Sequence, residues 1–190
     1  GGNNMNFKTS YLFVLASASP RRKELFSLRN VPFEIVTSDV EETSVTAQNV
    51  QQYVTEVALL KTRDVAKKCP NKTVIGADTI VVYNDMLLHK PKSREEAINH
   101  LQTLSNDTHD VLTAVAILAP NGQEFTFVEE TKVIFKDVPQ QLIEAYVDSA
   151  DPFDKAGGYG IQTDGVFFVD RIEGDYNNVV GLPIASLVEN

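Results

Sequence analysis

Apolar runs of strand length alternate along this chain with segments of helical pattern, and this alternation restricts the fold more than any other feature. Residues 11–16, 31–37 and 73–83 are apolar runs that predict strands. Residues 20–28 and 49–68 have a helical pattern. Mixed strands and helices, with hairpins farther along, predict an α/β protein with a mixed sheet.

Local signals mark the ends of several later elements. Ser93 is followed three places later by Glu96, a capping box that predicts a helix over 93–104. The sequence PNGQ lies between two apolar runs, 111–119 and 125–135, and predicts a hairpin. Asn84–Met86 predict a tight turn, Pro139 suits the first turn of a helix that runs to about residue 149, and 166–172 predict a strand.

Composition excludes several classes of protein. A chain of 190 residues with 43% hydrophobic residues predicts one domain over 1–190 with its own core. We expect Gly1 to Asn4, which precede Met5, to be a cloning remnant. No apolar run approaches the roughly 20 residues of a membrane span, and the start has no signal-peptide pattern. The single cysteine, Cys69, excludes an internal disulfide and a cysteine-rich zinc site, and fits a reducing compartment. A net charge of −9 argues against nucleic acid as a partner.

The stretch LASASPRR places two arginines where a helix begins. Ser19 suits the N-cap and Pro20 the first helical position, so Arg21 and Arg22 fall in the first turn. Cations there cost roughly 0.3–1 kcal/mol against the helix dipole. A bound phosphate, held by both guanidinium groups, by backbone N–H groups and by the hydroxyls of Ser17 and Ser19, would remove the conflict. The alternative is that both arginines point into solvent.

Two charged residues occupy apolar surroundings. Asp78 lies within the apolar run 73–83, where a carboxylate must be paired, bound to a metal or protonated, or hydrogen-bonded to a nearby turn. Lys61 lies in the apolar stripe of the helix over 49–68, four residues after Val57 and four before Val65. Lys61 either extends its amine to solvent or emerges from the core into a cleft. The pattern alone leaves both alternatives open.

Further charged residues complete a set suited to a polyphosphate. Glu41 and Glu42 follow the second strand and, with Asp78, offer oxygen ligands for a hard cation such as Mg²⁺. Lys90 precedes a proline, and Lys155 adjoins a glycine-rich loop. The three histidines, His89, His100 and His109, have no spacing typical of zinc ligands, and the GxxxxGK[ST] motif is absent. Arginines, lysines and carboxylates together predict binding of a polyphosphate with its metal.

Five motifs together resemble one protein family. LASASPRR, GADTIVV, HKP, DKAGGYGIQ and GDYNNVVGLP follow one another from Leu12 to Pro183 and resemble the Maf family of nucleoside triphosphate pyrophosphatases. Within that family the pattern is similar to the dTTP/UTP branch, because Arg21 directly follows the proline, Thr79 follows the aspartate and Gln162 ends the loop. The 7-methyl-GTP branch has a bulky residue before the arginines and Ser-Asp-Gln at the second motif.

The resemblance implies a fold, a reaction and a site. The fold is an elongated mixed β-sheet with flanking helices and two lobes around a cleft, similar to inosine triphosphatase. The reaction converts a nucleoside triphosphate to the monophosphate and pyrophosphate, with a divalent cation, Mg²⁺ or Mn²⁺, in a cytoplasmic enzyme for which a homodimer is one arrangement. The implied roles are phosphate binding by Ser17, Arg21 and Arg22, charge neutralisation by Lys61, Lys90 and Lys155, metal binding by Glu42 and Asp78, proton acceptance by Asp78, and substrate choice by Arg21, Thr79 and Gln162.

The chemistry of the base agrees with this reading. Uracil and thymine present alternating acceptor, donor and acceptor groups, and the amide of Gln162 has both kinds of group to pair with them. The alternative for Gln162 is a glutamine bonded to backbone at a strand end. Two residues depart from the family pattern, His89 before the lysine and Asp175 in GDYNN.

Two other functions stay open at this stage. One keeps the chemistry but changes the base, to 7-methyl-GTP or a broad range of nucleotides. The other is a nucleotide-binding regulator of cell division, because the family name comes from septum formation. Asp78 discriminates between enzyme and sensor, because a sensor needs no general base in an apolar strand.

Overall fold

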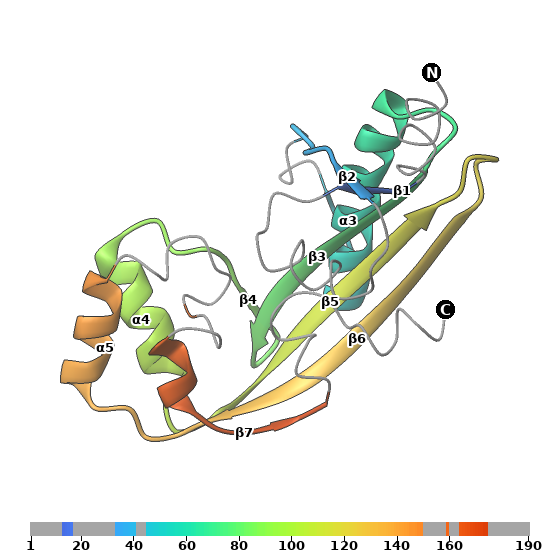
Figure 1. Cartoon of the computed structure of the whole chain (residues 1–190). Coiled ribbons are helices and arrows are strands. Elements are labelled where there is room, and N and C mark those ends of the chain that lie inside the picture. The colour runs from blue at the N-terminus through green and yellow to red at the C-terminus, as the bar shows by residue number, and fades with distance from the viewer. Residues whose placement is uncertain (1–12, 17–32, 41–44, 150–158, 160–163, 175–190) are drawn as a thin grey trace. The chain divides into compact units, whose positions relative to one another are not determined.

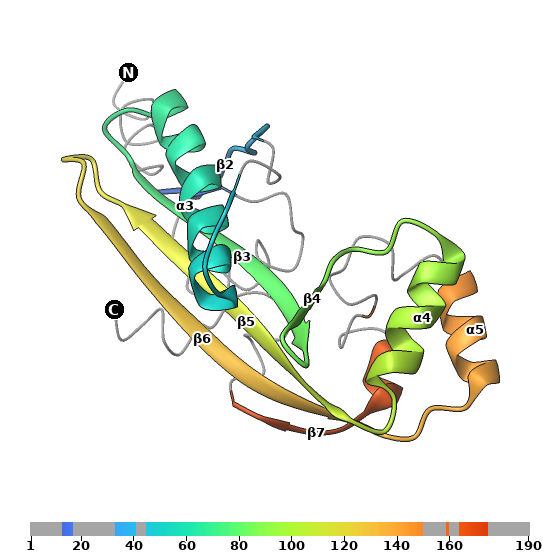
Figure 2. The same cartoon turned by 180° about the vertical axis from the view of Figure 1, so that it is seen from behind.

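Seven strands form one mixed sheet in the part of the chain that the structure, a computed structural model, describes (Figures 1 and 2). That part comprises residues 13–16, 33–40, 45–149, 159 and 164–174. The strands are β1 (Phe13–Ala16), β2 (Phe33–Ile35), β3 (Thr73–Tyr83), β4 (Met86–Leu88), β5 (Thr108–Leu118), β6 (Glu124–Phe135) and β7 (Val169–Glu173). Their order is β2-β1-β3-β5-β6-β7, with β4 paired to β3.

The sheet contains both parallel and antiparallel pairs. β1 runs parallel to β2 and to β3, whereas β4 is antiparallel to β3 and β7 is antiparallel to β6. β3 is buried along most of its length, as expected of a strand with a parallel neighbour and an almost continuous apolar sequence. The predicted mixed α/β class is therefore confirmed.

Three α-helices accompany the described strands, α3 (Val50–Lys68), α4 (Arg94–Leu104) and α5 (Gln140–Asp148). The Asn49 side chain caps α3 by accepting a hydrogen bond from the Gln52 backbone N–H at 2.8 Å, and the Ser93 hydroxyl caps α4 in the same way at Glu96, at 3.1 Å. Both helices begin where the sequence predicts. Among the described helices, none is long and apolar enough to cross a membrane.

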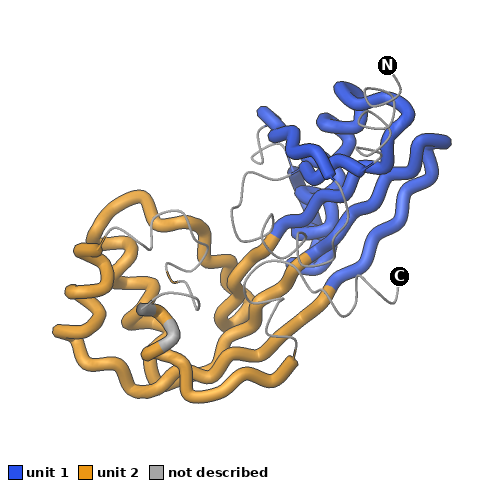
Figure 3. The backbone as a smooth tube through the Cα atoms, viewed as in Figure 1, with its two compact units in different colours: residues 1–78, 114–128 blue, residues 79–113, 129–190 orange. Residues whose placement is uncertain are grey.

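The chain divides into two compact units (Figure 3). Unit 1 contains residues 1–78 and 114–128, and unit 2 contains residues 79–113 and 129–190. The long strands β3, β5 and β6 contribute residues to both units. The single domain over 1–190 and the cleft between two lobes stay predictions.

Unit 1 is built around α3 and its neighbouring strands. The helix buries one face, on which Val54, Val57 and Val65 are fully inaccessible. On β1, Val14 and Leu15 are equally buried. The apolar stripe that predicted this helix is therefore its packing face.

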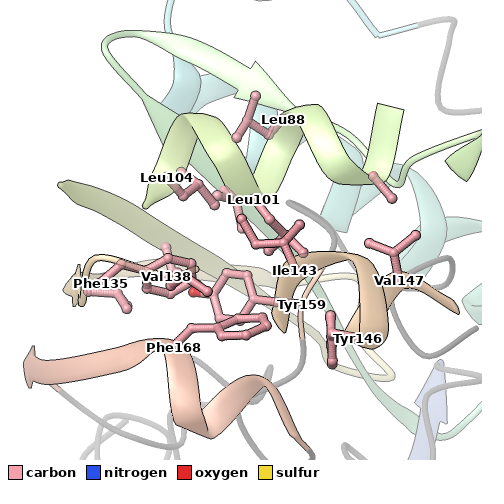
Figure 4. Packing of buried hydrophobic residues seen from close by; sticks show 14 residues of the cluster. Leu88, Leu101, Leu104, Phe135, Val138, Ile143, Tyr146, Val147, Tyr159 and Phe168 are labelled. Carbon is pink, nitrogen blue, oxygen red and sulfur yellow. The ribbon is translucent and has the colours of Figure 1, made fainter. Parts of the chain in front are cut away.

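Unit 2 has an aromatic core between α4, α5 and the strands (Figure 4). Phe135 and Phe168 pack edge to face with ring centroids 5.9 Å apart, and Tyr146 meets Phe168 at 5.0 Å. Tyr159 packs edge to face on Phe135, with centroids 4.9 Å apart. Such pairs contribute about 0.5–1.5 kcal/mol each beyond their burial.

Several predicted boundaries are wrong by a few residues, and two of them have a clear physical reason. The strand predicted over 166–172 begins only at Val169, because Asp164–Phe168 form a 3₁₀ turn. This turn buries Phe168 in the aromatic core and leaves Phe167 exposed. Pro139 is the N-cap of α5 and not a first-turn residue, since its ψ of 144° is extended.

Candidate active site

Asp78 is the only charged residue in the eleven residues of β3. It lies near the middle of the strand and is 8% exposed. A carboxylate at this depth requires a compensating partner, since burying an unpaired charge is very unfavourable. The structure supplies that partner from α3.

Lys61 pairs with Asp78. Its Nζ donates a hydrogen bond to Asp78 Oδ1 at 3.1 Å, and the two side chains are 23% and 12% exposed. Lys61 therefore directs its amine to the carboxylate in the strand, although it lies on the packing face of α3. A half-buried ion pair of this kind is weak evidence of stability, but buried titratable groups with a charged partner cluster at functional sites, so the pair is a candidate for chemistry.

Thr79 follows Asp78 and belongs to unit 2. Its hydroxyl lies 2.8 Å from the hydroxyl of Thr113 on β5, and one of the two donates to the other. Thr113 is fully buried. The predicted substrate-choice residue is thus held in place by a second threonine that the sequence analysis did not single out.

Tyr159 is the one residue of the KAGGYGIQ motif that lies among the described residues. It is 6% exposed, and its hydroxyl lies 2.7 Å from Nε2 of His109. Burial raises the pKa of Tyr159 above its ordinary value. The motif is therefore fixed to the core of unit 2 at this residue.

His109 is a buried residue that the sequence analysis did not place in the core. It is 1% exposed, and burial lowers its pKa from 6.5 to about 4, against a smaller opposing effect of Asp107. The imidazole is therefore neutral near pH 7. The alternation of His109 with Val111 and Thr113 along β5 was the available signal, since residues two apart share one face of a strand.

Lys90 lies between β4 and α4 and is exposed, as is His89 before it. The other predicted site residues lie outside the described residues, so their predicted roles stay predictions: Ser17, Arg21, Arg22, Glu42, Lys155 and Gln162. Asp175, the second departure from the family pattern, also lies outside them.

The predicted metal site is represented in the described residues by Asp78 alone. A carboxylate is the oxygen ligand that Mg²⁺ and Mn²⁺ favour, so the donor chemistry of Asp78 fits such an ion. Among the described residues, no three or more His, Cys, Asp or Glu side chains lie close enough together to hold a metal. Glu42, its predicted partner, is outside them.

A carboxylate on a strand, paired with an ammonium from a helix in a mixed α/β fold, defines a candidate active site for proton transfer. The chain belongs to the family of Maf-like proteins, whose family model matches residues 12–190. The resemblance predicted from the five motifs is confirmed.

Curated relatives match over almost the whole chain. The dTTP/UTP pyrophosphatase of Geobacillus sp. is 50% identical over 175 residues, which are 92% of this chain and 94% of the relative. A dTTP/UTP pyrophosphatase of Bacillus cereus is 51% identical over 175 residues, 92% of this chain and 91% of the relative. Among solved structures, the Ham1 protein of Staphylococcus aureus is similar with a TM-score of 0.47 and 19% identity, over 66% of this chain and 72% of that one.

Proposed function

We propose that this chain hydrolyses dTTP and UTP to the nucleoside monophosphate and pyrophosphate. Its family and the names of relatives at about 50% identity over 92% of the chain support this activity. The observation that carries the proposal is the Lys61–Asp78 pair at 3.1 Å, because it gives the buried carboxylate of Asp78, the proton acceptor implied by the family resemblance, a cationic neighbour.

Asp78 acts as the general base in this proposal. The carboxylate takes a proton from the attacking water, the water oxygen bonds to the α-phosphorus, and the bond from that phosphorus to the bridging oxygen breaks. Pyrophosphate leaves with the bonding electrons, and the monophosphate keeps the water oxygen. General-base catalysis of this kind contributes about 10²–10⁴-fold.

Lys61 compensates the charge on Asp78 and adds positive charge beside the reacting phosphates. An ammonium held in a half-buried place stabilises developing negative charge more strongly than one in bulk water. Because it touches the base directly, we assign Lys61 a catalytic role together with Asp78.

The remaining predicted residues bind the substrate. We assign the phosphate chain to Ser17, Arg21, Arg22, Lys90 and Lys155, and the base to Thr79 and Gln162. Guanidinium groups suit phosphate because their N–H donors match its oxygens in pairs.

A divalent cation belongs to the proposal as well. We assign Mg²⁺ or Mn²⁺ to the carboxylates of Glu42 and Asp78, where the ion would neutralise charge on the triphosphate. We also propose a cytoplasmic location, which the single cysteine fits, and a homodimer.

The activity for which the relatives are named favours dTTP and UTP over 7-methyl-GTP, and over a sensor without turnover. The Ala-Asp-Thr sequence at residues 77–79 agrees, because the 7-methyl-GTP branch would have Ser-Asp-Gln there. A pure sensor would have no use for the ion pair between Lys61 on α3 and Asp78 on β3.

A panel of nucleoside triphosphates tests the proposal. The protein is incubated with Mg²⁺ and, in turn, dTTP, UTP, CTP, GTP and 7-methyl-GTP, and pyrophosphate and orthophosphate are measured separately. We expect rapid pyrophosphate release from dTTP and UTP and slow release from the rest. Orthophosphate as the product, or faster release from 7-methyl-GTP, would contradict the proposal.

A further inference from the structure

Gly76 on β3 lies against Thr62 on α3 with no room for a side chain at the glycine. A Cβ at Gly76 would overlap Oγ1 of Thr62 and would lie 3.1 Å from its Cβ and 3.5 Å from its Cγ2. Gly76 is not among the described residues with positive φ, so its backbone does not demand glycine. The glycine is required by the close approach of the helix to the strand.

Thr62 is poorly able to move away. It is fully buried, and its Oγ1 donates a hydrogen bond of 2.6 Å to the carbonyl oxygen of Ala58 one turn earlier. Its β-branched side chain has few rotamers in a helix, and rotation would turn the methyl group or the hydroxyl toward the strand. The contact therefore fixes the distance between α3 and β3 at this point.

This contact adjoins the candidate catalytic pair on both elements. Thr62 directly follows Lys61 along α3. Gly76 precedes Asp78 by two residues, so the two positions share one face of β3. The separation set by Gly76 and Thr62 is thus the separation across which Lys61 reaches Asp78 at 3.1 Å.

We propose that Gly76 and Thr62 are positioning residues that hold α3 close enough to β3 for Lys61 to engage Asp78. Neither residue touches the substrate in this account. The inference rests on the proposed function only for the statement that the pair is catalytic, since the contact and the ion pair are both in the structure.

The test replaces Gly76 and then relieves the overlap. Gly76→Ala should lower kcat for dTTP about tenfold to a hundredfold with little change in KM, because a displacement of about 1 Å at a reacting group has this effect. Adding Thr62→Ala removes Oγ1 and should restore most of the lost kcat, measured against Thr62→Ala alone. A double variant as slow as Gly76→Ala would overturn the inference.

Gly174→Ala is the matched control. Gly174 has a φ of 134°, and a Cβ there would lie 2.8 Å from Oγ1 of Thr131, so this variant also crowds a buried threonine. It belongs to unit 2, whereas the pair belongs to unit 1. The melting temperature of Gly174→Ala should fall while the kcat of the folded enzyme stays unchanged. An equal loss of kcat in Gly174→Ala and Gly76→Ala would show that Gly76→Ala acts by general destabilisation.

Two further measurements test the inference when Gly76→Ala does not fold and when the proposed function fails. If Gly76→Ala does not fold, Thr62→Val replaces Oγ1, the atom nearest to Gly76, by a larger methyl group and should also lower kcat; an unchanged kcat would contradict the inference. A crystal structure of Gly76→Ala should show Lys61 Nζ and Asp78 Oδ1 beyond hydrogen-bonding distance. An unchanged distance of 3.1 Å would refute the inference, whereas absence of turnover in the wild type would refute only the proposed function.

Discussion

Replacing the buried His109 by glutamine should make the stability of this protein less dependent on pH. His109 is 1% exposed and its pKa falls from 6.5 to about 4 on folding, chiefly through burial. Its Nδ1 is buried without a hydrogen-bond partner among the described residues, so a proton there would find no acceptor. Glutamine has a similar volume and a polar amide for Tyr159, but it does not titrate.

The sign and size of the effect follow from linkage. The unfolded histidine takes up a proton below about pH 6.5, whereas the folded one stays neutral until about pH 4, so acid favours the unfolded state. The stabilisation is complete above pH 6.5 and is lost as the pH falls toward 4. The full loss is about 3 kcal/mol, of which about 2 kcal/mol falls between pH 7 and pH 5.

Urea unfolding followed by circular dichroism at both pH values measures this difference. Carboxylates with lowered pKa, such as Asp107 and Asp148, also contribute to acid sensitivity, but they are present in both proteins. We therefore expect wild type to lose about 2 kcal/mol more than His109→Gln over this range. Equal losses would show that His109 has the same pKa in the folded and unfolded chains, and would refute the reasoning.

Variants at two further positions, Ser93 and Thr113, test local parts of the fold. Ser93→Ala should lower the free energy of unfolding by about 1 kcal/mol, because it removes the hydroxyl that caps α4, and Ser93→Asp should recover most of this in thermal melts. Thr113→Val should lower the free energy of unfolding by about 1 kcal/mol and change the ratio of kcat/KM for dTTP and UTP, because it removes the hydroxyl that lies 2.8 Å from that of Thr79. Thr113→Ser, the control, should keep both the stability and the ratio. An unchanged ratio in Thr113→Val would show that this contact does not affect substrate choice.

Local signals predicted the elements of this fold well where a single residue type has a clear physical effect. The capping box at Ser93 predicted the start of α4, and the PNGQ turn between two apolar runs predicted the hairpin of β5 and β6. The start of β7 at Val169 was not predicted, because the apolar run does not indicate which of its aromatic residues is buried in the core. Burial of Phe168 in the aromatic core decided this, and it is a tertiary effect.

The candidate site was predicted residue by residue but not as a set of contacts. Asp78 and Lys61 each stood out against apolar neighbours, yet they lie 17 residues apart on different elements, and nothing local pairs them. The bond between His109 and Tyr159 spans 50 residues. The glycine at position 76 has no local signal for its role, since the need arises only from the approach of α3.

Asp78→Asn tests the central claim most directly, through pyrophosphate release from dTTP beside a binding measurement on the same protein. Asparagine keeps the shape of the side chain but accepts a proton poorly, so release should fall at least about a hundredfold. Binding of dTTP should remain measurable, because none of the residues proposed to hold the phosphates and the base is changed. Pyrophosphate release close to the wild-type rate would show that Asp78 is not the proton acceptor.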